Sequence, residues 1–180
     1  MKGKLIIFCV LFVATIVFLG ACDPAVTVPI EPITFDMDFN PVAKDVRNGR
    51  ELAGLERVAV TVPAMQQLEG VTVQELLPQL EAVFETLLDE FDFEVFFSDT
   101  DYRTDPASLF AQGTARQGAN QYSVGRNVPG LDSLLRILNQ PQQQDTLFVS
   151  VRHNYAGEQP VRGQMNVTGN ARVGVGGLLR

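Results

Sequence analysis

The chain has few of the residues on which metal sites, disulfide frameworks and nucleic-acid binding depend. It contains two cysteines, one histidine and no tryptophan in 180 residues. One histidine and two cysteines are too few for a His/Cys zinc site or a set of disulfides. Acidic residues outnumber basic ones, since the chain has 21 Asp and Glu but 14 Lys and Arg, and the net charge is −7. Phosphates demand a basic protein face, so this balance argues against a nucleic-acid partner.

The composition is that of a folded protein of one domain. The hydrophobic fraction is 46% and the charged fraction 19%, which excludes a charged, core-less disordered chain. A chain of 180 residues is long enough for one domain with an appended segment.

The N-terminal segment has the organisation of a secretory signal peptide. Lys2 and Lys4 form a short basic head, and an apolar run from Leu5 to Phe18 follows. The run ends in the small-residue motif Leu19-Gly20-Ala21-Cys22. A basic head, an apolar stretch and small residues before a cleavage site are the three parts of such a peptide. We therefore expect residues 1–21 to be a signal peptide.

The motif Leu19-Gly20-Ala21-Cys22 resembles the lipobox of bacterial lipoproteins. That resemblance implies cleavage between Ala21 and Cys22, with diacylglycerol on the Cys22 sulfur and an N-acyl lipid on its new amino group. It also implies a place in the bacterial cell envelope, attached to a membrane through the lipid. Asp23 follows the cysteine, which among lipoproteins of enteric bacteria favours the periplasmic face of the inner membrane.

Two alternatives to lipidation remain open at this point. The apolar and small residues from Leu5 to Ala21 are at the lower limit of the roughly 17–25 that a membrane span needs. They could form an uncleaved anchor, although no basic cluster follows to stop transfer. A plain secreted form is the other alternative. After the signal, residues 22–33 contain three prolines and predict an extended, lipidated tether, with a single domain over residues 34–180.

Alternating apolar and polar residues predict strands in several parts of the domain. The longest alternation runs from Val161 to Val175, and we expect Gly163, Gly169 or Gly174 to bend it. With the strand before it, this segment predicts a C-terminal hairpin. The expected strands are residues 33–39, 58–62, 91–97, 147–151 and 161–175.

Helical spacing of apolar residues predicts a main helix at about 73–90 and a short second helix at about 131–139. Pro78 conflicts with the beginning of the first helix, because proline inside a helix loses a hydrogen bond and clashes with the preceding turn. The expected fold class is therefore α+β, with an antiparallel β-sheet or two-layer sandwich and one main helix.

Three carboxylates close in sequence are weak candidates for a metal site. Asp99, Asp101 and Asp105 could offer oxygen ligands to Ca²⁺. A calcium loop beginning at Asp99 needs Gly at its sixth position and Glu at its twelfth, where this chain has Thr104 and Phe110. We expect a solvated turn and no metal.

No catalytic residue is expected. His153 is the only histidine, and no Ser or Cys nucleophile lies in a recognisable setting beside it. An apolar groove between the main helix and the sheet is the other candidate site. The residues expected to line it are Phe84, Phe91, Phe93 and Phe97.

These observations predict a non-enzymatic cell-envelope module, tethered through Cys22, that binds or supports an envelope protein partner. The alternative is a carrier of lipid or another apolar ligand in the helix–sheet groove. No cofactor is expected beyond the covalent lipid.

Overall fold

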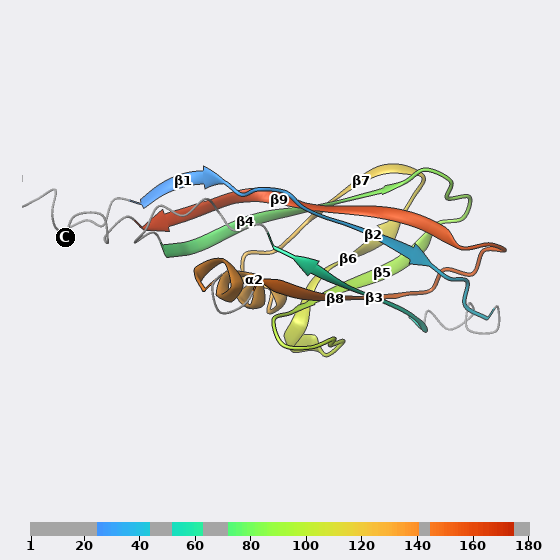
Figure 1. Ribbon diagram of the computed structural model, residues 1–180. Coiled ribbons are helices and arrows are strands. Elements are labelled where there is room, and N and C mark those ends of the chain that lie inside the picture. The colour runs from blue at the N-terminus through green and yellow to red at the C-terminus, as the bar shows by residue number, and fades with distance from the viewer. Residues whose placement is uncertain (1–24, 44–51, 63–71, 141–144, 175–180) are drawn as a thin grey trace, which may run out of the picture.

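The structure is a computed structural model that describes residues 25–43, 52–62, 72–140 and 145–174 (Figure 1). Of these residues, 59% lie in strands and 10% in helices. The strands are β1 (Ala25–Pro29), β2 (Ile33–Phe39), β3 (Gly54–Thr61), β4 (Thr72–Phe84), β5 (Phe91–Ser98), β6 (Leu109–Ala115), β7 (Gly118–Ser123), β8 (Thr146–His153) and β9 (Val161–Gly174). The helical elements are the 3-10 turn η2 (Pro106–Ser108) and the α-helix α2 (Gly130–Asn139).

The strands form two antiparallel sheets that pack face to face (Figure 1). In the first, β1 and β2 share one edge of β9, and β4 and β7 follow. The second has the order β3-β8-β5-β6. Strand β2 pairs with β9, β3 with β8, β4 with β7 and β5 with β6. The chain is thus one long hairpin wrapped into two sheets, which is the connectivity of a jelly roll.

The expected main helix at 73–90 is wrong, because residues Thr72–Phe84 form strand β4. Leu76, Leu80 and Phe84 recur every four residues, a spacing that places side chains on one face of either a helix or a strand. Leu77 and Leu88 distinguish the two, since the helix would bury them and they are 38% and 95% exposed. The fold is therefore mostly β and not α+β.

The position of Pro78 agrees with a strand. Its side chain is buried in the inward row of β4, opposite Gly169 of β9. Pairing with β7 begins only at Gln79, so Pro78 lies just outside that ladder. Proline is tolerated in a sheet at such places, because the missing N–H is not needed there.

The expected short helix at 131–139 is confirmed by α2, which spans Gly130–Asn139. The five expected strands are confirmed as β2, β3, β5, β8 and β9. The C-terminal hairpin is wrong, because β8 and β9 belong to different sheets. Of the three glycines expected to bend β9, Gly169 has a positive φ of +146°, and the register with β4 continues through it without a shift. A side chain there would lie 2.3 Å from the Leu77 carbonyl oxygen.

The N-terminal part of the domain begins earlier than expected. Residues Ala25–Pro29, within the expected tether, pair with β9 from Gly174 to Asn170 as strand β1. The expected signal peptide, Cys22 and Asp23 lie outside the described residues. No helix in the described part of the chain is long and apolar enough to cross a membrane.

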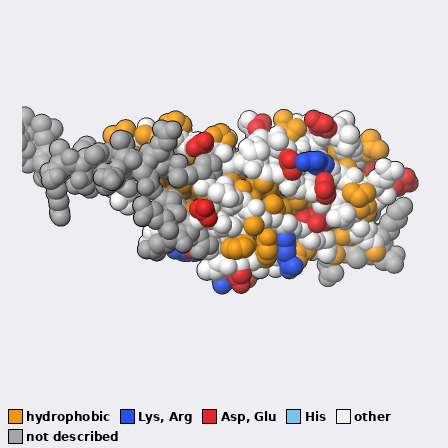
Figure 2. Space-filling view, viewed as in Figure 1, with side chains coloured by type: hydrophobic (Ala, Val, Ile, Leu, Met, Phe, Trp, Pro, Cys, Tyr) orange, Lys and Arg blue, Asp and Glu red, His pale blue; other side chains and the backbone are white. Residues whose placement is uncertain are grey.

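The core lies between the sheets and is rich in phenylalanine. At one end of the sandwich, Phe39, Phe84 and Phe91 contact one another with ring centroids 5.1–5.6 Å apart. At the other end, α2 buries Leu134 and Ile137. Hydrophobic groups on the surface viewed in Figure 2 are small and separated by polar and acidic side chains.

Candidate functional site

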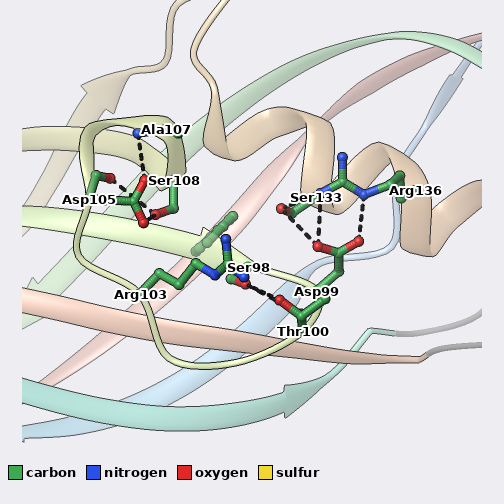
Figure 3. Close-up of a pocket in the computed structure, with 10 residues that line it drawn as sticks. Ser98, Asp99, Thr100, Arg103, Asp105, Ala107, Ser108, Ser133 and Arg136 are labelled. Atoms are coloured by element: carbon green, nitrogen blue, oxygen red, sulfur yellow. Dashed lines mark hydrogen bonds and ion pairs between the residues drawn. The ribbon is translucent and has the colours of Figure 1, made fainter.

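A polar pocket of about 290 Å³ lies between α2 and the loop that joins β5 to β6 (Figure 3). Its walls combine two carboxylates, two guanidinium groups and four hydroxyl groups. The lining residues are Phe97, Ser98, Asp99, Thr100, Arg103, Asp105, Ala107, Ser108, Ser133 and Arg136.

Hydrogen bonds to short side chains shape the loop wall. The backbone N–H groups of Thr100 and Asp101 donate to the Ser98 hydroxyl at 3.3 and 3.4 Å, which turns the chain at the end of β5. The Asp105 carboxylate then accepts from the Ala107 N–H at 2.9 Å and from the Ser108 hydroxyl at 3.1 Å. Asp105 is thereby the N-cap of η2. The loop is held by its own polar groups.

The helix wall approaches the loop closely at Gly130. A side chain at this position would lie 2.5 Å from the Ser108 carbonyl oxygen, so only glycine allows this contact. Ser133 and Arg136 follow at a spacing of three residues and lie on one face of the helix. Figure 3 shows both side chains directed toward Asp99.

Asp99 connects the two walls of the pocket. Its carboxylate accepts from Nη2 of Arg136 at 2.8 Å, from Nε of the same guanidinium, and from the Ser133 hydroxyl at 3.3 Å. Arg136 Nη2 also donates to the Ser133 oxygen at 3.0 Å. The hydrogen bond from Arg136 lowers the pKa of Asp99, and the same contact raises the pKa of Arg136. Both groups are charged at neutral pH.

The second guanidinium in the pocket is also paired. Arg103 donates through Nε to the Asp101 carboxylate, which also accepts from the Thr100 hydroxyl at 2.9 Å. The bond from Arg103 lowers the pKa of Asp101, and it raises the pKa of Arg103. These fixed charges and hydroxyl groups can bind a polar ligand.

The three candidate metal ligands do not converge. Asp99 pairs with Arg136, Asp101 with Arg103, and Asp105 caps η2. Among the described residues, no group of three His, Cys, Asp or Glu side chains is arranged to hold a metal ion.

His153 lies in the hydrophobic core. Its side chain is fully buried, with its ring 5.3 Å from Phe39. Nδ1 accepts the Tyr155 N–H at 3.2 Å, while Nε2 lies 3.6 Å from a Glu56 carboxylate oxygen. Gly54 leaves room for the imidazole, since a side chain there would lie 2.1 Å from the ring. Burial lowers the pKa of His153 despite Glu56, so the ring is neutral at pH 7.

The helix expected to cover the apolar groove does not form, because Thr72–Phe84 is strand β4. The four phenylalanines expected to line the groove are all core residues with 3% exposure or less. Phe84 packs on Phe91, and Phe97 stacks on Phe110 with centroids 3.9 Å apart. Phe97 alone among the four also reaches the polar pocket.

Sequence reasoning missed Ser133 and Arg136, the helix half of the pocket. Their spacing of three residues on a short amphipathic helix was visible, but nothing in the sequence connects them to Asp99, 34 and 37 positions away. That connection depends on how α2 packs against the end of β5.

Comparisons with known proteins give weak likenesses to three solved structures of different kinds. No family model and no curated protein sequence matches the chain. A protein of the disulfide-linked pili that form Bacillus endospore appendages aligns with a TM-score of 0.35 and 12% identity, over 83% of this chain and 90% of that one. A family two carbohydrate esterase from Cellvibrio japonicus aligns with a TM-score of 0.27 and 10% identity, over 84% of this chain and 36% of the esterase. An L-ribose isomerase from Acinetobacter sp. DL28 aligns with a TM-score of 0.21 and 14% identity, over 77% and 59% of the two chains. Likenesses at this level establish neither a family nor an activity for this chain.

Proposed function

We propose that this protein is a lipid-tethered module of the bacterial cell envelope that binds a ligand without chemically changing it. Cys22 is the proposed lipid attachment site, and the polar pocket between the β5–β6 loop and α2 is the proposed binding site. The proposal joins the lipobox resemblance of residues 19–22 with the geometry of the folded domain.

The start of β1 supports a domain held close to the membrane. Ala25 is the first residue of β1, three positions after Cys22 in the sequence. Three residues span at most about 10 Å when fully extended. A lipid on Cys22 would therefore keep this end of the sandwich near the bilayer, in place of the longer tether expected from residues 22–33.

The binding role is inferred from the way in which the charged groups of the pocket are paired. Asp99 is bonded to Arg136 and Ser133, and Asp105 is used as a helix cap. General acid–base catalysis favours a group whose pKa lies near the working pH, whereas the pKa of Asp99 is lowered below the ordinary carboxyl value. Such a set of groups recognises a ligand through hydrogen bonds.

The alternative role as an apolar carrier has no support in the part of the chain that the structure describes. It required a helix over the sheet at residues 73–90, and this segment is β4. The phenylalanines that were expected to line the groove pack against one another in the core.

Lipid attachment is tested by replacing Cys22. In a bacterial host fed a clickable fatty acid, we expect Cys22→Ser to abolish labelling of the protein and to release it from the membrane fraction. Cys9→Ser is the matched control, because Cys9 lies inside the expected signal peptide, and it should leave both readouts unchanged. Full labelling of Cys22→Ser would contradict the proposal.

A further inference from the structure

We propose that the pocket between the β5–β6 loop and α2 binds a neutral, polyhydroxylated ring, the chemistry of a saccharide unit. This inference extends the proposed binding role by naming the ligand class. It does not depend on the lipid anchor, so the two proposals can fail separately.

The charge balance of the pocket favours a neutral ligand. The lining holds two carboxylates, of Asp99 and Asp105, and two guanidinium groups, of Arg103 and Arg136, so the formal charges cancel. Arg136 is held by Asp99, and Arg103 is held by Asp101. An anionic ligand would compete with these carboxylates for the guanidinium groups, and a cationic ligand would compete with the guanidinium groups for the carboxylates.

The hydrogen-bonding groups suit neighbouring hydroxyls. A sugar hydroxyl donates one hydrogen bond and accepts others, so it fits best between an acceptor and a donor. Asp99 supplies carboxylate oxygens beside the Arg136 guanidinium. The bonds of Arg136 described above use Nε and Nη2, whereas a guanidinium has five N–H donors, which leaves those on Nη1. One hydroxyl of a vicinal pair can therefore donate to Asp99 while its neighbour accepts from Arg136.

Four hydroxyl side chains complete this lining and can both donate and accept. Ser98, Ser108 and Ser133 are 3–6% exposed, and the hydrogen bonds of the two walls fix their positions. The four residues that carry these hydroxyl groups are Ser98, Thr100, Ser108 and Ser133.

The size of the pocket sets the size of the ligand. Its volume of about 290 Å³ is near the lower end of small-molecule sites, which run from about 300 to 1,000 Å³. This favours one ring over an extended chain. A protein partner is the less suitable occupant, because stable protein interfaces bury about 1,200 Å² or more with an apolar centre.

An aromatic side chain beside the pocket offers a second contact. Tyr102 precedes the lining residue Arg103 and is 40% exposed. Its ring is held by Phe148, at 5.2 Å in an edge-on arrangement, and by the Arg57 guanidinium at 5.8 Å. Phe148 pairs with Ser98 across the sheet, which places Tyr102 next to the pocket. Exposed aromatic rings contact the apolar C–H groups of sugars, so a second saccharide unit can extend toward Tyr102.

Ligand-detected NMR tests the proposal on the full chain. The protein is extracted in deuterated LDAO, a detergent without a sugar head group. Saturation transfer to maltotriose and to triacetylchitotriose is then measured across millimolar concentrations. We expect saturable transfer to at least one of these neutral oligosaccharides, and no displacement by an equal concentration of inorganic phosphate. Absence of saturable transfer to both, or displacement by phosphate, would overturn the proposal.

Two variants with a matched control locate the site. Asp99→Asn removes the charged acceptor and should weaken oligosaccharide binding about tenfold or more. Ser133→Ala removes one hydroxyl and should weaken it less, about threefold to tenfold. Asp36→Asn makes the same chemical change in another Asp–Arg pair, with Arg162, outside the lining of the pocket, and should stay within about twofold. Equal affinity in all three variants would overturn the assignment, and Ser133→Ala provides the test if Asp99→Asn does not fold.

Discussion

The two ends of the sandwich place polar groups in opposite surroundings. At the aromatic end, His153 is fully buried beside Phe39 and Phe91, and its Nε2 has no hydrogen-bond partner among the described residues. At the helix end, Asp99 and Arg136 are partly exposed and share several hydrogen bonds. The aromatic end thus owes its stability to apolar packing, whereas the helix end has polar groups arranged where a ligand can reach them.

The register of β4 shows that the two ends lie far apart. Phe84, in the aromatic cluster, is the last residue of β4, and Val73 near its beginning is bonded to Asn139 of α2. Eleven residues of strand separate them by about 36 Å at roughly 3.3 Å per residue. Since Ala25 pairs with Gly174 beside Thr72, the helix end is also the end nearest the proposed lipid.

Truncating the aromatic cluster should produce the largest loss of stability. We expect Phe91→Ala to lower the free energy of unfolding by about 3–5 kcal/mol, because it opens a cavity among closely packed rings. Leu88→Ala is the control at a 95% exposed side chain, and should change that free energy by less than about 0.5 kcal/mol. Urea denaturation measures both. Similar losses in the two variants would contradict the packing described for this end.

Removing the two hydrogen bonds that connect Asn139 of α2 to Val73 of β4, here called the clamp, should lower the free energy of unfolding by an intermediate amount. The Asn139 side chain accepts the Val73 N–H at 2.8 Å and donates to the Val73 carbonyl at 3.0 Å. Val73 lies at a β-bulge before Glu75, where the ladder to β9 is interrupted. Asn139→Ala should cost about 1–2 kcal/mol, because both backbone groups lose a partner.

Gln140→Ala is the comparison for the clamp, since Gln140 is exposed and directly follows Asn139. Denaturation curves should show little change for this variant. Equal losses for the two substitutions would assign the effect to fraying of the helix end.

Lowering the pH should reduce the free energy of unfolding through His153. This loss should be smaller than those expected for Phe91→Ala and Asn139→Ala. The pKa of His153 is lowered by burial from the ordinary 6.5, so below that pH the unfolded chain binds a proton that the folded chain excludes. Stability is therefore fully present above pH 6.5 and falls as the pH drops below it. The pKa values of Asp99 and Asp101 are lowered from 3.8, so these groups titrate at more acidic pH.

The histidine effect is measured as the change in urea midpoint between pH 7.5 and pH 5.5. His153→Gln keeps an acceptor for the Tyr155 N–H and removes the titrating group, so its midpoint should change less over this interval. An unchanged pH dependence in His153→Gln would assign the effect to other groups.

Local patterns predicted the elements whose periodicity was unambiguous. In β2, apolar residues alternate strictly from Ile33 to Phe39, and the structure has the same bounds. The short helix was predicted because Leu131, Leu134, Leu135 and Leu138 share one helical face, and the structure places α2 there. Strand β7 was missed because its residues Gly118–Ser123 are nowhere fully buried and show little contrast.

The sequence alone determined the apolar alternation of individual strands, the short helix, and the acidic, cysteine-poor character of the chain. Lipid attachment at Cys22 stays a prediction. The tertiary structure decided that Thr72–Phe84 is a strand, since four-residue spacing fits both periods and only pairing with β9 and β7 selects one. It also decided that β8 and β9 lie in different sheets. The pocket depends on the same long-range packing, because Asp99 meets Arg136 only after α2 has docked against the end of β5. Strand and helix periods are local properties of the chain, whereas pairing and docking are set by contacts between residues far apart in sequence.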